Sequence, residues 1–174
     1  MANHHTMSKL LFFRETQRFN QFWIWLVMTI TWGAVLTGFY YDAIEMNHSF
    51  WDVITDVHFI IVMSILLPVT MLLLLIKMET AIRKDGVWVR FFPFHRSFRK
   101  YSWHKLSEFY VRKYRPIGEF GGWGLRGLGK NRVMNVRGNM GLQLEFKDGK
   151  KLLIGTQKPK DIERVLSDIW KRNN

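Results

Sequence analysis

Three side chains within residues 42–56 have the types and the spacing of metal ligands. His48, Asp52 and Asp56 recur every four residues, so a helix over this segment would place all three on one face. Imidazole nitrogens and carboxylate oxygens bind hard or borderline divalent ions. The alternative is structural, because short polar segments often contain this pattern and both aspartates also suit helix ends.

A glycine-rich segment, GGWGLRG at residues 121–127, contains the GxGxxG pattern of dinucleotide-binding loops. That chemistry requires a turn from a strand into a helix within a βαβ unit, whereas no helical pattern follows this segment. We therefore expect a loop that presents Trp123 and Arg126, which are residue types common at membrane interfaces and in protein-binding hot spots. The alternative is that Trp123 fills the core of its own domain.

The stretch 96–115 combines a high density of cations with interleaved aromatic residues. This combination can bind nucleic acid. A domain tethered beside an anionic leaflet meets phospholipid headgroups first, and each Lys or Arg near such a surface contributes about 1 kcal/mol. We therefore weigh lipid contact equally with an ordinary solvated face and place nucleic acid below both. The cations of this stretch are Arg96, Arg99, Lys100, Lys105, Arg112, Lys113 and Arg115.

The whole chain is basic, with 26 Lys and Arg against 14 Asp and Glu. The excess lies in residues 77–174, where 23 basic residues stand against 9 acidic ones. Such an excess indicates phosphate-bearing partners or, in a membrane protein, a cytoplasmic location. The chain has no cysteine, which excludes disulfides and thiolate chemistry. No Ser-His-Asp or paired-carboxylate pattern accompanies His95 or His104, so we expect neither enzymatic activity nor a cofactor.

Two uninterrupted apolar stretches lie in the first half of the chain. Residues 22–41 and 57–76 each span 20 positions without Asp, Glu, Lys or Arg. A helix of that length covers the roughly 30 Å hydrocarbon core of a bilayer. We therefore predict a transmembrane hairpin. The preceding segment, residues 9–21, mixes apolar and charged side chains, and either lies in the interface as a short amphipathic helix or extends the first span.

The charges at the ends of these stretches indicate their orientation. Lys9, Arg14 and Arg18 precede the first stretch, and Lys77 and further cations follow the second, whereas the connection between them has four acids and no Lys or Arg. The positive-inside rule then places both termini in the cytoplasm. We expect a multi-pass inner membrane protein in which residues 1–78 form the interfacial segment and the hairpin.

From residue 79 onward, short apolar runs alternate with turn signals. Asp-Gly and Gly-Asn pairs separate several runs, which indicates β-hairpins. About six or seven antiparallel strands, arranged as a sandwich or small barrel, follow from this pattern. An amphipathic helix beginning near Pro159 would cover an open end or face of the sheet. The expected strands are 80–83, 87–92, 98–103, 106–114, 131–136, 141–146 and 151–154, and the helix buries Ile162, Val165, Leu166, Ile169 and Trp170.

Five segments carry a resemblance to a known family: FRETQRFNQFW, ETAIRKDGVWVRFFPF, YSWHKLSEFYVRKYRP, GGWGLRG and GNMGLQLEFKDGKKLLIGTQKPKDIERVL. Together they resemble bacterial two-span membrane proteins with a pleckstrin-homology-like (PH-like) cytoplasmic domain, a family of unknown function. The resemblance implies an α+β fold in which the hairpin is followed, in residues 79–174, by a small antiparallel β sandwich or barrel closed by a C-terminal helix. It implies no reaction.

We expect a membrane-anchored, non-enzymatic binding or scaffold module, and specifically an accessory subunit of a larger membrane complex. Its hairpin would pack with helices of other subunits or of further copies of the chain. Its basic domain would contact a protein partner or the anionic inner leaflet. The alternative is a component of an enzyme or transporter whose chemistry lies in a partner chain or in a metal site of the acidic connection.

Overall fold

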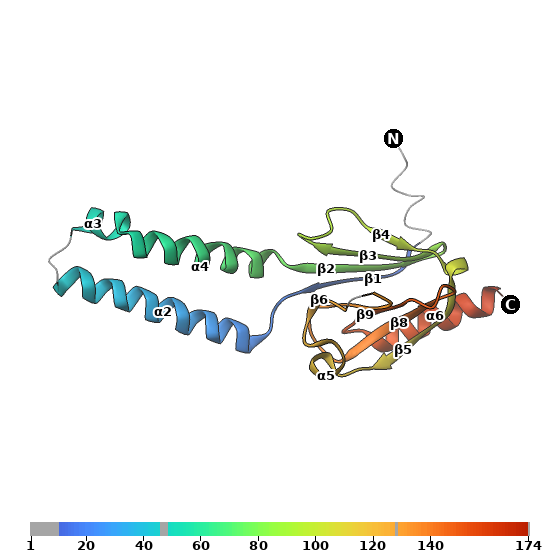
Figure 1. The fold of residues 1–174 in the computed structure, drawn as a ribbon. Coiled ribbons are helices and arrows are strands. Elements are labelled where there is room, and N and C mark those ends of the chain that lie inside the picture. The colour runs from blue at the N-terminus through green and yellow to red at the C-terminus, as the bar shows by residue number, and fades with distance from the viewer. Residues whose placement is uncertain (1–10, 46–48, 128, 174) are drawn as a thin grey trace. The chain divides into compact units, whose positions relative to one another are not determined.

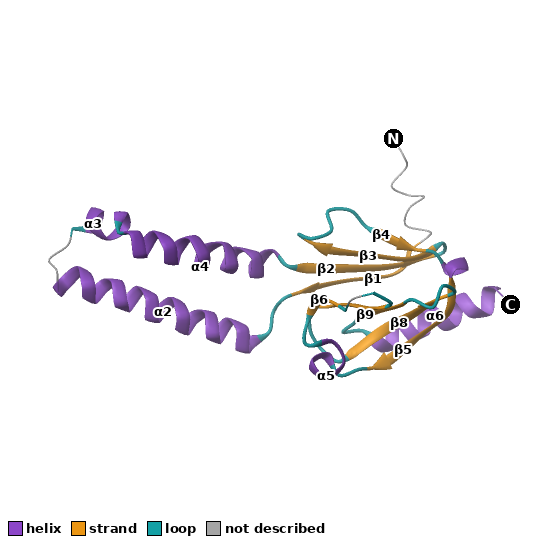
Figure 2. Cartoon of the chain, in the orientation of Figure 1, coloured by secondary structure: helices purple, strands orange, loops and turns teal. Residues whose placement is uncertain are grey.

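The computed structural model describes residues 11–45, 49–127 and 129–173 (Figure 1). The chain has an α+β fold and divides into two compact units. The helical unit is Asn20–Leu75, and the β unit combines the residues before it with those from Ile76 onward. Figure 2 shows this division in the distribution of helices and strands along the chain.

The helical unit is a hairpin of two long helices, α2 (Phe22–Glu45) and α4 (Val57–Leu75), with the short α3 (Phe50–Thr55) between them. The two long helices lie side by side and are joined by a hydrogen bond, which the indole Nε1 of Trp32 donates to Thr70 Oγ1 at 3.1 Å. Both helices match the predicted apolar stretches and are long and apolar enough to cross a membrane.

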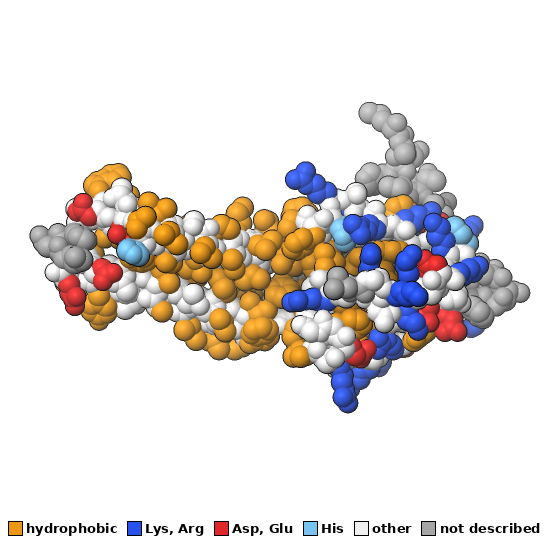
Figure 3. Space-filling model, in the orientation of Figure 1, with side chains coloured by type: hydrophobic (Ala, Val, Ile, Leu, Met, Phe, Trp, Pro, Cys, Tyr) orange, Lys and Arg blue, Asp and Glu red, His pale blue; other side chains and the backbone are white. Residues whose placement is uncertain are grey.

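The hairpin has almost no interior of its own. No residue of α2 is buried, and Leu66 is the one buried residue of α4. Figure 3 shows hydrophobic side chains over the visible face of both helices. Exposed apolar patches of this extent mark surfaces that contact lipid or another protein.

The segment before the hairpin is a strand, β1 (Leu11–Arg18), and not the interfacial helix or span extension expected from the sequence. It pairs antiparallel with β2 (Lys77–Arg83), in continuous register from Phe13 to Arg18 and with an irregularity between Leu11 and Phe13. Phe13, Glu15 and Gln17 are buried while their neighbours are mostly exposed. This alternation of buried and exposed positions does not appear in the sequence as an alternation of apolar and polar residues, because two of the three buried residues are polar. Residues 11–19 therefore belong to the β unit and not, as expected, with the hairpin.

The first sheet has the strand order β1-β2-β3-β4 and is antiparallel throughout. The turn at Lys84-Asp85-Gly86 joins β2 to β3 (Gly86–Phe92), as predicted. The following strand, β4 (Arg99–Tyr101), is shorter than the expected 98–103, because a single 3₁₀ turn (Trp103–Lys105) ends it.

The second sheet has the order β5-β8-β9-β7-β6, and its β7–β9 pair is parallel. This corrects the expectation of a purely antiparallel domain and of a hairpin between β7 and β8. The Arg137-Gly138-Asn139 turn does reverse the chain, but β9 lies between the two strands that it joins. The strands of this sheet are β5 (Leu106–Lys113), β6 (Gly124–Arg126), β7 (Asn131–Asn135), β8 (Met140–Phe146) and β9 (Lys151–Gly155).

Both sheets share one hydrophobic core with the C-terminal helix, α6 (Pro159–Asn173). The predicted apolar face of this helix is confirmed at Ile162, Leu166 and Ile169, which are buried. The helix contacts β1, β5 and β8. β1 and β5 are edge strands of the two sheets, so α6 covers one open edge of each sheet.

Candidate functional site

The basic stretch of the sequence does not form one patch. Its cations are divided between the two sheets and the connections that leave them. Arg96 lies between β3 and β4, Arg99 and Lys100 lie on β4, Arg112 and Lys113 lie on β5, and Arg115 directly precedes α5 (Pro116–Phe120). Sequence proximity therefore overestimates how many of these charges can act on one ligand.

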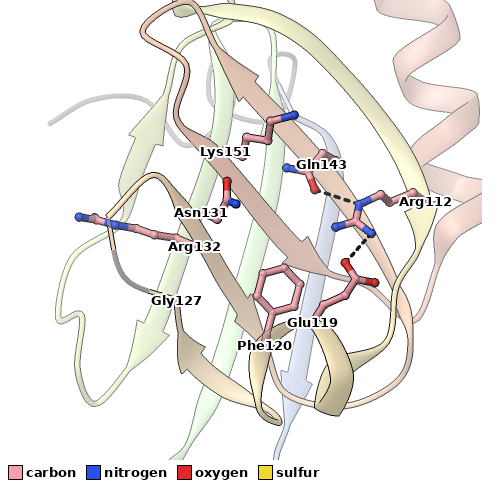
Figure 4. A pocket seen from close by; sticks show the side chains of 8 residues that line it. All are labelled: Arg112, Glu119, Phe120, Gly127, Asn131, Arg132, Gln143 and Lys151. Atoms are coloured by element: carbon pink, nitrogen blue, oxygen red, sulfur yellow. Dashed lines mark hydrogen bonds and ion pairs between the residues drawn. The ribbon is translucent and has the colours of Figure 1, made fainter.

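One hollow of about 530 Å³ lies over β5, β7, β8 and β9 beside α5; we call it the Arg112 hollow (Figure 4). Its lining residues are Arg112, Glu119, Phe120, Gly127, Asn131, Arg132, Gln143 and Lys151. Arg112 is held from two sides, because its Nε donates to Gln143 Oε1 at 3.0 Å and its Nη1 lies 2.9 Å from Glu119 Oε2. The backbone N–H of Arg115 and the Arg112 guanidinium hold the pKa of Glu119 below its usual range.

Lys151, at the start of β9, also lines the Arg112 hollow. Its ammonium lies 2.8 Å from Glu145 Oε1, which also accepts a hydrogen bond from the Tyr110 hydroxyl at 2.9 Å. The hydrogen bond to Glu145 raises the pKa of Lys151, and the same contact lowers the pKa of Glu145. Lys151 therefore stays charged beside the hollow.

Two further hollows share Arg132 with the first. The Lys105 hollow, of about 380 Å³, is lined among others by Lys100, Lys105, Lys130 and Lys150. The His95 hollow, of about 240 Å³, includes Arg99 and Arg126. Burial and the charge of Arg99 lower the pKa of His95. The cations of these hollows that have no carboxylate oxygen within 4.0 Å, among the described residues, are Arg99, Lys105, Arg126, Lys130 and Arg132.

This arrangement suits the binding of anions. Arg and Lys recognise phosphate or carboxylate groups through charge-assisted hydrogen bonds. The unpaired cations of the Lys105 and His95 hollows come from β4, from β6 and β7 and from the connections beside these strands. Asn131, Arg132, Gln143 and Lys151 escaped the sequence analysis, because they are isolated polar residues within strands and only the pairing of the second sheet assembles them.

The glycine-rich segment forms a loop and the short strand β6, which pairs with β7. In the described residues it is therefore followed by strands, and not by the helix of a dinucleotide site. Trp123 is half-buried and its Nε1 donates to the Gly138 carbonyl at 3.2 Å, while Arg126 Nε donates to the Trp123 carbonyl at 3.3 Å. Arg126 is exposed and lines the His95 hollow. These hydrogen bonds show that Trp123 helps to fix the conformation of the loop.

The two aspartates proposed as metal ligands cap helices. Ser49 and Asp52 form a reciprocal capping box at the start of α3. Asp56 Oδ1 accepts the backbone N–H groups of His58 at 2.8 Å and Phe59 at 3.1 Å at the start of α4, and these bonds lower its pKa. His48 lies outside the described residues. The described part of the chain has no cluster of three or more His, Cys, Asp or Glu suited to a metal.

The fold and the hollows define a protein with two long apolar helices joined to a basic two-sheet unit. The chain belongs to a family of unknown function, DUF6141, whose profile matches residues 6–170. Comparisons with curated proteins and with solved structures give no match. The profile covers both units, so the family match includes the helical hairpin as well as the β unit.

Proposed function

We propose that this chain is a membrane-anchored, non-enzymatic binding module, and that it serves as an accessory subunit of a larger membrane complex. The observation that carries the proposal is the hairpin. Its two helices are long enough to span a bilayer and leave nearly all of their apolar side chains unburied. Such helices are stable in lipid, or against other membrane helices, because water would penalise the exposed apolar area.

In this proposal both termini are cytoplasmic and the α2–α4 connection lies on the other side of the membrane. The described ends of the helices differ in charge in the way that the positive-inside rule requires. Arg18 and Lys77 flank the hairpin on the side of the β unit, whereas Asp42, Glu45 and Asp52 lie toward the connection.

The β unit is the binding part of the proposed module, and we assign it a PH-like architecture. Short strands in two sheets, with a C-terminal amphipathic helix packed on them, support that assignment. The hollows around Arg132 support an anionic partner, either an acidic surface of a membrane protein or the anionic leaflet. The ligand binds by charge and hydrogen bonds, and no covalent step is part of the proposal.

The test is purification of the full-length chain from its native membranes in a mild detergent, followed by intact-mass measurement. The proposal predicts a defined complex with another membrane protein. An Arg132→Gln variant is expected to retain the membrane fraction and to lose the partner, whereas Lys84→Gln, an exposed cation in the β2–β3 turn, is expected to keep it. A lone monomer in every preparation would contradict the role of accessory subunit.

A further inference from the structure

Both long helices join the β unit at the same end of one strand pair. β1 ends at Arg18 and β2 begins at Lys77, directly opposite in the register. The pairing extends one step further, where the Phe19 backbone N–H donates to the Ile76 carbonyl at 3.4 Å. The hairpin is thus an insertion between two adjacent antiparallel strands. The connections are residues 19–21 and residue 76, which at full extension reach only about 14 Å and about 7 Å.

The connection between β3 and β4 leaves the β unit at this same end. Phe92, the last residue of β3, pairs with Lys77. Two residues later, Phe94 exposes 58% of its surface. Its ring lies 6.1 Å from that of buried Phe91, which anchors the base of the connection in the core.

Helix α5 also lies at this end. The Gln17 side-chain amide donates to the Gly155 carbonyl at 2.8 Å, and Gly155 pairs with Gly141 across β8 and β9. The backbone N–H of Tyr114, which follows β5, donates to Asn139 at 2.9 Å. These contacts place the end of β5, and therefore α5, beside the end of β1. Within the β unit, Figure 1 shows α5 and the β3–β4 connection at the end where β1 stops and β2 starts.

The two most exposed large apolar side chains of the β unit, among the described residues, lie at this end. Ile117 in α5 is 69% exposed and Phe94 is 58% exposed, whereas Leu11 at the opposite end is 36% exposed. Five cations belong to the strand ends and connections at this end, namely Arg18, Lys77, Arg96, Arg115 and Arg137. Lys77 lies 3.5 Å from Glu79, which is also paired with Arg90, and Glu119 is paired with Arg112.

We propose that this end of the β unit is a bilayer-contact surface, with Phe94 and Ile117 inserted at the level of the headgroups of an anionic phospholipid leaflet. The inference rests on the proposed anchoring of the hairpin. Short connections keep the end of β1 and β2 within reach of the bilayer, aromatic and aliphatic side chains favour the interface, and cations pair with lipid phosphates. The surface fixes the β unit against the membrane, so that its hollows face a partner in one orientation.

The test uses the full-length chain, which has no cysteine of its own. Single variants Phe94→Cys, Ile117→Cys, Leu11→Cys and Ile30→Cys are labelled with an environment-sensitive fluorophore and reconstituted into vesicles of phosphatidylcholine and phosphatidylglycerol. Quenching by lipids that carry a spin label near the headgroup is then measured. Leu11 is the matched apolar control at the opposite end, and Ile30 in α2 reports on the hairpin.

Quenching at positions 94 and 117 with none at position 11 is the expected result. Two results would overturn the bilayer-contact surface and leave the anchoring of the hairpin intact. One is equal quenching at positions 11, 94 and 117. The other is no quenching at positions 94 and 117 while position 30 is quenched by lipids that carry the spin label deeper in the acyl chain. Absence of quenching at position 30 with every label would instead overturn the anchoring, and the inference with it.

Discussion

The buried carboxylate of Glu15 joins β1 to the segment between β9 and α6, and its removal is expected to destabilise the β unit by several kcal/mol. Glu15 is 5% exposed. Its Oε2 accepts the Thr156 hydroxyl at 2.6 Å, and its Oε1 accepts the Gln157 backbone N–H at 2.8 Å. These bonds connect positions 141 and 142 residues apart, so they exist only in the folded β unit.

The magnitude follows from the two hydrogen bonds. A bond to a charged acceptor contributes about 1.5–3 kcal/mol, and a buried donor left unpaired costs about 1–3 kcal/mol. Glu15→Ala removes both acceptors. The Thr156 hydroxyl can rotate toward another partner and the N–H of Gln157, an exposed residue, can bond to water, so the loss of the two charge-assisted bonds sets the cost. We expect the free energy of unfolding to fall by about 3–5 kcal/mol for Glu15→Ala and by about 1–3 kcal/mol for Glu15→Gln, which keeps one acceptor.

The assay is denaturant unfolding of the full-length chain in mild detergent, combined with hydrogen exchange of the segment 151–158. Arg14→Ala is the matched control, because Arg14 is the exposed neighbour on the same strand, and a change of less than about 0.5 kcal/mol is expected for it. Exchange of the Gln157 amide should accelerate in Glu15→Ala and not in the control. If both variants unfold alike and exchange alike, Glu15 is solvated and residues 11–18 do not form this strand.

Three further predictions concern other contacts. Ile162→Ala in α6 should lower the free energy of unfolding by about 2–5 kcal/mol, whereas exposed Ser167→Ala should change it by less than about 0.5 kcal/mol, as thermal unfolding would show. Burial alone would raise the pKa of Glu79, but its ion pair with Arg90 lowers this pKa below the usual 4.5. The pair therefore stabilises the folded state above pH 4.5, and this stabilisation is lost as the pH falls through the lower pKa that Glu79 has in the folded protein. An Arg90→Leu variant should show a flatter loss of stability in acid, and an unchanged slope would disprove the assignment. Thr70→Val, which removes the hydrogen bond from Trp32, should weaken the α2–α4 pair by about 0.6 kcal/mol in detergent unfolding, and no change would show that the contact does not hold the helices.

The long helices and the C-terminal helix are predictable from the sequence because their signals are local. The uncharged stretches at 22–41 and 57–76 correspond to α2 and α4, and the spacing of Ile162, Leu166 and Ile169 corresponds to the buried face of α6. Asp-Gly turns likewise predict the β2–β3 and β8–β9 hairpins, since the turn residues fix both the reversal and the neighbour.

The missed features depend on contacts between residues far apart in the sequence. The strand β1 was not predicted because polar Glu15 and Gln17 occupy its inward positions. Glu15 accepts hydrogen bonds from Thr156 and Gln157, and the Gln17 amide donates to the Gly155 carbonyl. The parallel β7–β9 pair escaped because a turn signal predicts a reversal of direction and not the strand that will lie alongside. The hollows around Arg132 escaped for the same reason, because their walls come from several strands and connections.

In the proposed topology the hairpin spans a membrane, with the β unit on one side and the α2–α4 connection on the other. The absence of native cysteine allows a direct test by single-cysteine labelling with a membrane-impermeant maleimide. Glu45→Cys, at the exposed end of α2, should react from one side of the intact membrane, whereas Ser167→Cys, on the exposed face of α6, should react only from the other side, after the membrane is opened. Labelling of both positions from the same side would contradict this topology.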